Sequence, residues 1–284
     1  MPKDIKKVLI LGSSGQIGSH LVKFCLNMGV SVVEYDVSRN PDEDLRQYSP
    51  MLSQLVKEVD FIFFLAFDVG GSRYLEKYQH TFDFVDNNMK IMTNTFNVLR
   101  ESKQPFIFAS SQMSNMTNSP YGVLKLLGEH TTRILGGLTV HFWNVYGYEK
   151  DNDKSHVITD FVRMANQTGE IRMRTNGVEE RDFLYADDAC SALMTLATNF
   201  ESINLEEKLH ITSFTWSSIL EVAQIVSEKT GAQVIPSSNL DKVQNSQKNA
   251  ADKFILNYWS PSVNLRDGID KIMGLILEEH HVRG

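Results

Sequence analysis

Three glycines between an apolar run and an amphipathic segment constrain the fold of this chain most. The apolar residues 8–11 precede the loop Gly12-Ser-Ser-Gly15-Gln16-Ile17-Gly18, and apolar residues then recur with a helical period. A glycine loop between a buried strand and a helix lets backbone N–H groups approach a diphosphate, where the helix dipole favours negative charge. Gly12, Gly15, Gln16, Ile17 and Gly18 are therefore candidate contacts of a dinucleotide.

The alternation of strand and helix patterns continues through the first half of the chain. Short, uniformly apolar runs are typical of parallel strands buried on both faces, and the longer segments between them have helical periods. The expected strands are 8–11, 30–35, 61–66, 106–109 and 138–143, and the expected helices are 16–28, 89–100 and 121–135. This order predicts an α/β fold with a Rossmann-like, doubly wound parallel sheet.

The pattern weakens after about residue 147, where shorter elements follow one another. Two short strands and a helix are expected at residues 170–174, 208–211 and 217–230. The helix has a candidate N-cap at Thr215 or Ser217, and Gly231 suits its C-terminal end. We expect a dinucleotide-binding domain over residues 1–147 that carries the catalytic residues. A smaller α/β lobe over residues 148–284 would mainly bind substrate, with some segments returning to the core.

Composition limits the classes of partner. Twenty-eight Lys and Arg against 35 Asp and Glu give a net charge of −7, and the basic residues are scattered, so no nucleic-acid partner is expected. Cys25 and Cys190 lack metal-site spacing and are expected to be buried thiols, with no metal. The longest apolar run, 61–67, is far shorter than the roughly 18 residues of a membrane span. The apolar stretch after the basic N-terminus is too short for a signal peptide, so we expect a cytoplasmic protein with no membrane partner.

An acidic residue follows the second expected strand, where a dinucleotide fold binds the adenosine ribose. Asp36 stands 24 positions after Gly12, and a carboxylate there accepts from the ribose hydroxyls and repels the 2′-phosphate of NADP. Arg39 can partly accommodate that phosphate, so NAD is favoured and NADP stays open. Asp44 is a candidate acceptor for the adenine amino group, or a solvated loop acid.

A tyrosine and a lysine form the candidate catalytic pair. Tyr121 and Lys125 stand at positions i and i+4 of an expected helix and share one face. An ammonium there would lower the pKa of the phenol from about 10, which suits a general acid or base. Alone, the spacing fits an amphipathic surface pair equally well. Ser110 and Ser111, however, follow a buried strand, and strand ends of a doubly wound sheet share the edge of the glycine loop. The motifs thus predict one cleft.

These motifs, with Asn144-Val-Tyr-Gly147 and Arg181-Asp-Phe-Leu-Tyr-Ala-Asp-Asp188, resemble the extended short-chain dehydrogenase/reductase family over nearly the whole chain. That family includes nucleotide-sugar epimerases and dehydratases. The resemblance implies that Tyr121 is the catalytic acid/base. It also implies that Lys125 binds the nicotinamide ribose and lowers the pKa of Tyr121, and that Ser111, rather than Ser110, orients the reacting hydroxyl.

The same resemblance implies further contacts with the cofactor and substrate. Leu65 and Ala66 match a backbone segment that lines the cofactor. Asn88 matches a family asparagine on the helix after the fourth strand. Arg181 matches an arginine that contacts the diphosphate of a sugar nucleotide, and Asn144 would lie near that substrate.

The chain departs from the family pattern in four ways. Gln112-Met113 stands where 4,6-dehydratases carry an Asp-Glu pair, which disfavours loss of water because neither side chain shuttles a proton. Gln112 also replaces the cysteine of double epimerase/reductases, although His156 resembles the histidine partner of that cysteine; a loop histidine is the alternative. His141 replaces a family arginine. Tyr121 follows Ser111 by only ten positions, which predicts a short flap and an open site.

The sequence therefore predicts an NAD-dependent oxidoreductase that acts on a nucleotide-linked sugar. Hydride transfer is expected at C4, giving epimerisation or net oxidation or reduction. A non-enzymatic dinucleotide sensor is the alternative, and a structural or RNA-associated relative is a third. Excess apolar residues on helices 89–100 and 121–135 predict a homodimer through a four-helix contact.

Overall fold

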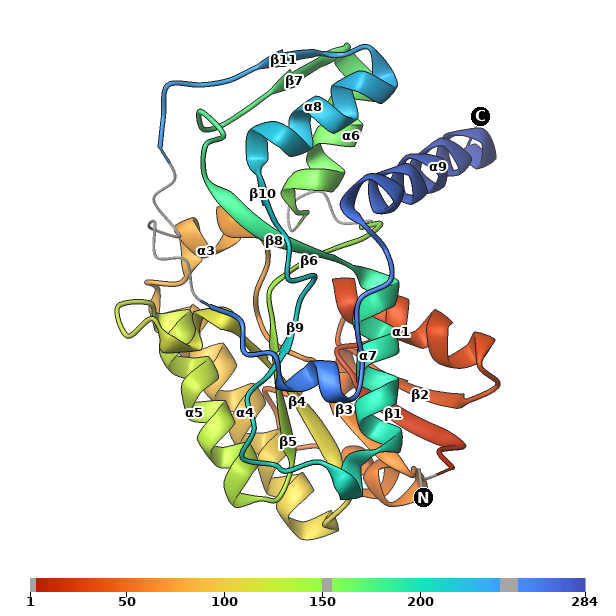
Figure 1. The fold of residues 1–284 in the computed structure, drawn as a ribbon. Coiled ribbons are helices and arrows are strands. Elements are labelled where there is room, and N and C mark those ends of the chain that lie inside the picture. Colours follow the sequence, from red (N-terminus) through yellow and green to blue (C-terminus); the bar gives the residue numbers. More distant parts are fainter. Residues whose placement is uncertain (1–3, 150–154, 241–249, 284) are drawn as a thin grey trace.

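The central layer of the molecule is a parallel sheet. The computed structural model describes residues 4–149, 155–240 and 250–283, and within them six parallel strands are ordered β2-β1-β3-β4-β5-β9 (Figure 1). The strands are β1 (Lys7–Leu11), β2 (Ser31–Tyr35), β3 (Phe61–Phe64), β4 (Phe106–Ser111), β5 (Leu138–Phe142) and β9 (Leu209–Ile211). The strand order reverses at β1, where open α/β sheets bind their ligands. The expected doubly wound α/β fold is confirmed.

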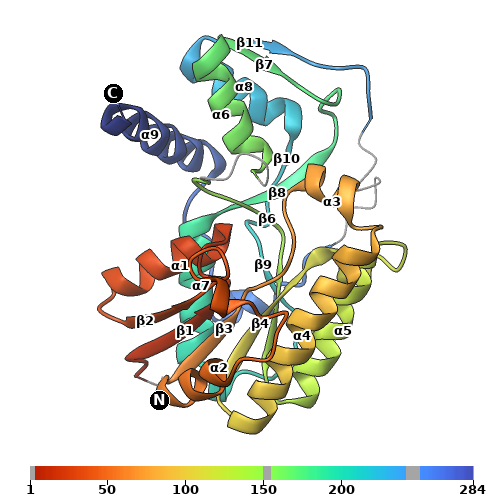
Figure 2. The same ribbon diagram turned by 180° about the vertical axis from the view of Figure 1, so that it is seen from behind.

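Helices cover both faces of this sheet (Figures 1 and 2). On one face α1 (Gln16–Asn27) packs against α7 (Ala186–Thr198), and on the other α4 (Phe82–Ser102) lies beside α5 (Pro120–Ile134), with the short α2 (Pro50–Leu55) next to α4. Within β1, residues alternate between the two cores: Val8 and Ile10 face α1 and α7, whereas Leu9 and Leu11 face α4. Burial on both faces explains why the strands are apolar at every position.

The second half of the chain builds a smaller lobe above the carboxyl edge of the sheet and also contributes to the sheet. The lobe contains the sheet β10-β8-β6 and the parallel pair β11-β7. Its elements are β6 (Asn144–Tyr146), α6 (Val157–Thr168), β7 (Glu170–Arg172), β8 (Glu180–Tyr185), β10 (Trp216–Ser218), α8 (Ile219–Thr230), β11 (Gln233–Ile235) and α9 (Leu265–Arg283). In contrast, β9 is a strand of the central sheet and α7 packs against that sheet, so the chain crosses between the sheet and the lobe more than once.

Several expected boundaries are wrong. The helix expected at 89–100 begins seven residues earlier, at Phe82, because the Thr81 side chain caps it by accepting from Phe84 N at 3.3 Å. The helix expected at 217–230 begins at Ile219 and is capped by Ser218, not by Thr215 or Ser217. Gly231 ends that helix with φ +75°, as expected. Strand β4 extends to Ser111, so both serines lie in the sheet.

Both cysteines are free and buried. The described residues contain no group of three or more His, Cys, Asp or Glu side chains that could hold a metal ion. None of the described helices has a stretch long and apolar enough to cross a membrane.

Candidate active site

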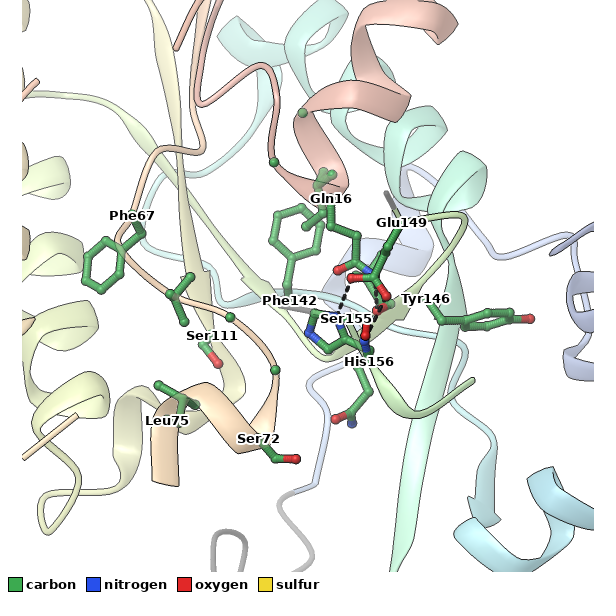
Figure 3. A pocket seen from close by; sticks show the side chains of 18 of the residues that line it. Gln16, Phe67, Ser72, Leu75, Ser111, Phe142, Tyr146, Glu149, Ser155 and His156 are labelled. Carbon is green, nitrogen blue, oxygen red and sulfur yellow. Dashed lines mark hydrogen bonds and ion pairs between the residues drawn. The ribbon is translucent and has the colours of Figure 1, made fainter. Parts of the chain in front are cut away.

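A single continuous cavity of about 1500 Å³ connects the predicted site residues. It runs along the carboxyl edge of the central sheet and reaches the lobe, where Arg181 lines it. The glycine loop, Asp36, Tyr121 and Lys125 line other parts of the same cavity. Figure 3 shows part of this lining, with side chains from the sheet, from α3 (Ser72–Tyr78) and from the lobe. Its volume exceeds the 300–1,000 Å³ typical of sites for small ligands, so it suits a long ligand or two ligands together.

The glycine loop is shaped for close approach to an anion. Gly12 adopts φ +86°, and a Cβ there would lie 2.7 Å from the backbone nitrogen of Ala66. A side chain at Gly18 would collide with the carbonyl oxygen of Gly12. Helix α1 then starts without a side-chain cap and without an acidic residue in its first turn, which leaves its N-terminal N–H groups for a ligand. Within the loop, the Ser13 hydroxyl is buried without a partner among the described residues, and it is a site residue that the sequence did not indicate.

Asp36 lies at the end of β2 and supports the loop that precedes it. Its carboxylate accepts from Ser14 N at 3.0 Å and from the N–H and hydroxyl of Ser38 at 2.9 and 2.8 Å. Arg39, the possible partner of a 2′-phosphate, forms an ion pair with Glu34 at 3.0 Å. Because Arg39 is paired with Glu34 and the Asp36 carboxylate lies beside the glycine loop, this end of the cavity suits the unphosphorylated ribose of NAD better than the 2′-phosphorylated ribose of NADP.

Asp44, the candidate partner of the adenine amino group, also lines the cavity but is already paired. Its carboxylate contacts the Arg46 guanidinium at 2.8 Å, and hydrogen bonding from Arg46 holds the pKa of Asp44 below its usual value. Gln16 and Ile17 line the cavity as well, and Gln16 Nε2 donates to the carbonyl of Val145 at 3.0 Å. That bond fastens the start of α1 to β6 in the lobe.

Leu65 and Ala66 line the cavity, whereas Asn88 is fully buried behind them. The Asn88 amide accepts from Asp68 N at 2.7 Å and donates to the carbonyls of Asp68 and Phe84 at 3.1 and 2.9 Å. The expectation that Asn88 follows the fourth strand is wrong, because α4 follows β3. Its described contacts hold the segment after β3 in place, so its action on a cofactor would be indirect.

The structure brings Ser111 and Tyr121 together. Tyr121 lies at the start of α5, which Ser119 caps by accepting from Gly122 N at 3.2 Å. Burial raises the pKa of the Tyr121 phenol to about 12, and its hydrogen bond with Ser111 opposes that rise. At neutral pH the phenol is therefore protonated. Ser110 lies one residue earlier and on the other side of the strand, where its hydroxyl donates to the carboxylate of Glu129.

Lys125 is buried one helical turn after Tyr121, with its ammonium turned toward the sheet. Nζ donates to the carbonyl of Ala109 at 2.7 Å and lies 3.7 Å from the centre of the Phe67 ring. Nζ is 5.8 Å from the centre of the Tyr121 ring, and burial lowers the pKa of Lys125 itself to about 7. Burial therefore dominates the pKa of both groups in this structure, and the expectation that Lys125 lowers the pKa of Tyr121 stays a prediction.

Asn144 and Arg181 lie at the lobe end of the cavity. They belong to the neighbouring strands β6 and β8, and Asn144 Nδ2 donates to the carbonyl of Asp182 at 3.4 Å. The Arg181 guanidinium donates to the carbonyl of Glu180 at 2.7 Å and still borders the cavity. Gln112 and Met113, which follow Ser111, also line it, and neither side chain can transfer a proton.

A histidine–carboxylate pair faces the same cavity, with Glu149 buried and the side chain of His156 35% exposed. His156 Nδ1 lies 2.7 Å from Glu149 Oε1, and His156 N donates to Glu149 Oε2 at 2.8 Å (Figure 3). Burial favours the neutral imidazole, but the Glu149 carboxylate outweighs it and raises the pKa of His156. Nearby, Arg73 of α3 contacts Asp160 at 3.0 Å. The sequence indicated His156 but neither Glu149 nor Arg73, because nothing in their local pattern marks them.

The fold and this cavity define a dinucleotide-binding α/β protein, and a family model identifies which kind. Residues 8–211 match the NAD dependent epimerase/dehydratase family, which is well over half of the chain. The protein belongs to that family. NAD, expected from the glycine loop and Asp36, is the cofactor of the family.

Individual relatives are more distant. The chain is 29% identical over 266 residues to the UDP-N-acetyl-alpha-D-glucosaminuronate decarboxylase of Bacillus cytotoxicus, covering 79% of this chain and 80% of the relative. Among solved structures, an epimerase of Methanothermobacter thermautotrophicus superposes with a TM-score of 0.83 at 20% identity, covering 98% and 94% of the two chains. MoeE5, solved with UDP-glucuronic acid and NAD, superposes with a TM-score of 0.77 at 22% identity, covering 96% and 99%. At these identities the structural likeness shows the fold alone.

Proposed function

We propose that the protein transfers a hydride between NAD and a hydroxyl carbon, C4, of a sugar attached to a nucleoside diphosphate. One observation carries the proposal: a single cavity contains the hydrogen-bonded Ser111–Tyr121 pair, with the glycine loop and Asp36 on one side and Arg181 on the other. The loop and Asp36 suit a dinucleotide. The Arg181 guanidinium offers a fork of donors that matches diphosphate oxygens.

The proton is handled by this chain's own side chains. When bound, NAD supplies the hydride acceptor. Tyr121 takes the proton of the sugar hydroxyl during oxidation and returns it during reduction, while Ser111 holds the reacting oxygen against the phenol. A phenol with a pKa of about 12 is protonated at neutral pH, so Tyr121 must lose its proton before it can take one from the sugar hydroxyl. Lys125 would bind the ribose of the nicotinamide nucleotide.

The fate of the ketone decides between epimerisation and net oxidation or reduction. The hydride can return to the opposite face of C4, or the ketone can leave. Following the absorbance of bound NADH while UDP-, GDP- and dTDP-sugars are added in turn identifies the substrate and the outcome. Tight NAD binding with no turnover of any sugar nucleotide would instead support the alternative, a dinucleotide sensor.

The Glu149–His156 pair favours a second candidate function, decarboxylation of a sugar uronate. Oxidation at C4 makes the C6 carboxylate part of a β-keto acid, which loses carbon dioxide and leaves an enolate that must be protonated at C5. His156 is a proton donor of suitable type, since Glu149 raises its pKa and both residues border the cavity. The decarboxylase relative and the UDP-glucuronic acid complex of MoeE5 are consistent with such a substrate.

Turnover in heavy water separates the two candidates. A protein that only moves a hydride at C4 places no solvent deuterium on sugar carbon, whereas protonation at C5 does. The variant His156→Gln should slow carbon dioxide release and deuterium uptake at least tenfold, as loss of a general acid does. His130→Gln, an exposed change on α5 outside the cavity, is the control.

We also propose that the protein is a homodimer through α4 and α5. Six of the apolar residues that suggested this contact are buried within the subunit, namely Ile91, Met92, Phe96, Val98, Leu99 and Leu124. The exposed ones are fewer: Met89, Val123, Leu127 and Ile134, with exposed fractions of 48, 45, 51 and 82%. Phe82, 79% exposed, adds to them at the start of α4. Pairing these helices with a second copy would cover this surface.

A further inference from the structure

A row of polar side chains crosses three strands of the central sheet on the face covered by α5, the helix that carries Lys125. Ser110 of β4 pairs in register with His141 of β5, and His141 pairs in register with His210 of β9. Side chains in register on neighbouring parallel strands point to the same face of a sheet. The helix α5 crosses over this row and contributes Glu129 to it.

The contacts in this row converge on the carboxylate of Glu129. The Ser110 hydroxyl donates to it, and His141 Nε2 lies 3.2 Å from it. Ser114 adds a further hydrogen bond. Although burial alone would raise the pKa of Glu129, its bonds and charge interaction with His141, together with the two serines, hold it to about 2. Glu129 therefore carries a negative charge at neutral pH.

The far end of the row is also fixed. The rings of His141 and His210 are stacked, with centres 4.8 Å apart and planes 13° apart. Trp143 Nε1 donates to His210 Nδ1 at 2.9 Å, and Trp143 itself lines the cavity. Burial and the neighbouring His141 lower the pKa of His210 to about 4. Of the more distant charges, Asp252 raises this pKa and Lys208 lowers it. His210 is therefore neutral at physiological pH.

Glu129 stands one helical turn after Lys125 on the same face of α5. The other groups around Lys125 Nζ are uncharged: the carbonyl of Ala109 and the rings of Phe67, Phe108 and Tyr121. Burial disfavours the ammonium, and among the described residues the charge that opposes this effect is that of Glu129. Removing this carboxylate would leave a buried cation with only neutral partners.

We propose that Glu129 is a positioning residue for Lys125: it holds a fixed negative charge one turn from the lysine, and Ser110, His141 and His210 keep that carboxylate in place. This rests on the proposed role of Lys125 in the site. It also gives Ser110 a function different from the catalytic one. The hydroxyl of Ser110 serves the lysine, whereas that of Ser111 serves the tyrosine.

The test measures the titration of Lys125 directly, without any substrate. Isotope-labelled lysine is observed by NMR, and the signal of Lys125 is assigned by its loss in Lys125→Met. In Glu129→Gln the pKa of Lys125 should fall by about one unit below its value in the native protein, a tenfold loss of proton affinity, because a nearby opposite charge has been removed. Glu129→Asp, which keeps the charge, should restore most of the difference.

The control is Glu206→Gln, which removes an exposed carboxylate that pairs with Arg133 at the far end of α5 at 3.2 Å. It should leave the pKa of Lys125 unchanged. If Glu129→Gln does not fold, the double variant Glu129→Leu with His141→Leu serves instead. It replaces the carboxylate and its buried partner together, and folded proteins tolerate replacement of both members of a buried polar pair better than removal of one. The same fall in pKa is expected there.

An unchanged pKa of Lys125 in folded Glu129→Gln, or in the double variant, overturns the proposal. A fall that Glu129→Asp does not reverse also overturns it, since repacking rather than charge would then be responsible. Neither result touches the proposed hydride transfer, which depends on Tyr121 and is tested by turnover. Conversely, a protein without turnover can still show the expected fall, so the two proposals fail separately.

Discussion

The cavity has two walls that the chain builds in different ways. The sheet wall consists of β4 and α5, and its chemical groups, Ser111, Tyr121 and Lys125, lie within 15 consecutive residues. The lobe wall combines Arg73 from α3 with Glu149, His156 and Arg181 from the second half of the chain. The groups of the first wall are close in the sequence, whereas those of the second come from distant segments that the fold brings together.

The walls also differ in what sets their acidity. On the sheet wall burial dominates: it raises the pKa of Tyr121 to about 12 and lowers that of Lys125 to about 7, so both groups favour their neutral forms. On the lobe wall a charged partner dominates, since Glu149 raises the pKa of His156 despite burial. The comparison shows that one cavity can hold a phenol whose pKa is set by burial and a histidine whose pKa is raised by a neighbouring carboxylate.

The largest expected effect is on the sheet wall. Tyr121→Phe should lower turnover of the identified sugar nucleotide by about 10²–10⁴-fold and leave NAD affinity within a few fold, because only the proton-transfer group is lost. Steady-state kinetics and NAD titration measure both quantities. If the variant keeps more than about a tenth of the native turnover, Tyr121 is not the acid/base and the division between the two walls fails.

On the lobe wall, binding rather than chemistry should suffer. Arg181→Ala should raise KM for a sugar nucleotide by about 10–100-fold with little change in NAD affinity, since it removes a charge-assisted fork to the diphosphate. Arg133→Ala, outside the cavity on α5, is the matched control. An unchanged KM would place the diphosphate elsewhere, with Arg172 and Arg174 as the next residues to test.

The stability of the two walls should respond oppositely to pH. The lowered pKa of Lys125 means that its burial penalty is full below about pH 7 and disappears as pH rises toward the ordinary lysine value of 10.5. Lys125→Met should therefore raise the free energy of unfolding by about 1–3 kcal/mol near pH 6 and by less near pH 9. The raised pKa of His156 has the reverse sign, so His156→Gln should cost stability at acidic pH and less as pH rises.

Urea denaturation of both variants at the two pH values measures these differences. A loss of stability in Lys125→Met near pH 6 would show that the ammonium's bond to Ala109 outweighs its burial. The sheet wall would then be stabilised by polar contacts in the same way as the lobe wall.

A smaller effect is expected at the adenosine end. Asp36→Ala should weaken NAD binding about tenfold and narrow the preference over NADP, because one charge-assisted contact to the ribose disappears. Fluorescence titration with both cofactors measures it, and Asp42→Ala, exposed on the same segment and outside the cavity, is the control. Equal NAD affinity in Asp36→Ala would contradict the ribose assignment.

The smallest effect on activity is expected outside both walls. Leu127→Glu should convert the proposed dimer into a 32.3 kDa monomer at micromolar concentration while the cavity stays intact, because a charge cannot be buried in an apolar four-helix contact. Light scattering measures the mass. A native protein that is monomeric at every concentration would exclude the dimer, and a dimer that survives Leu127→Glu would exclude this interface.

The sheet wall was largely predictable from the sequence because its spacings are local. The i, i+4 spacing places Tyr121 and Lys125 on one face of a helix, and the apolar run before Ser111 indicates a buried strand that ends there. The choice between Ser110 and Ser111 was not predictable with certainty. It depends on which side of β4 each hydroxyl faces and on Glu129, 19 residues away, which accepts from Ser110.

The sequence by itself determined the order of strands and helices, the glycine loop and the residues at the strand ends. Periods of two and 3.6 residues and the steric freedom of glycine act over short distances. Only the tertiary structure decided that Lys125 is turned toward Ala109, that Glu149 meets His156, and that Asn88 fastens the segment after β3. Acidity and contact depend on burial and on partners that the fold brings together, and no local pattern contains either of them.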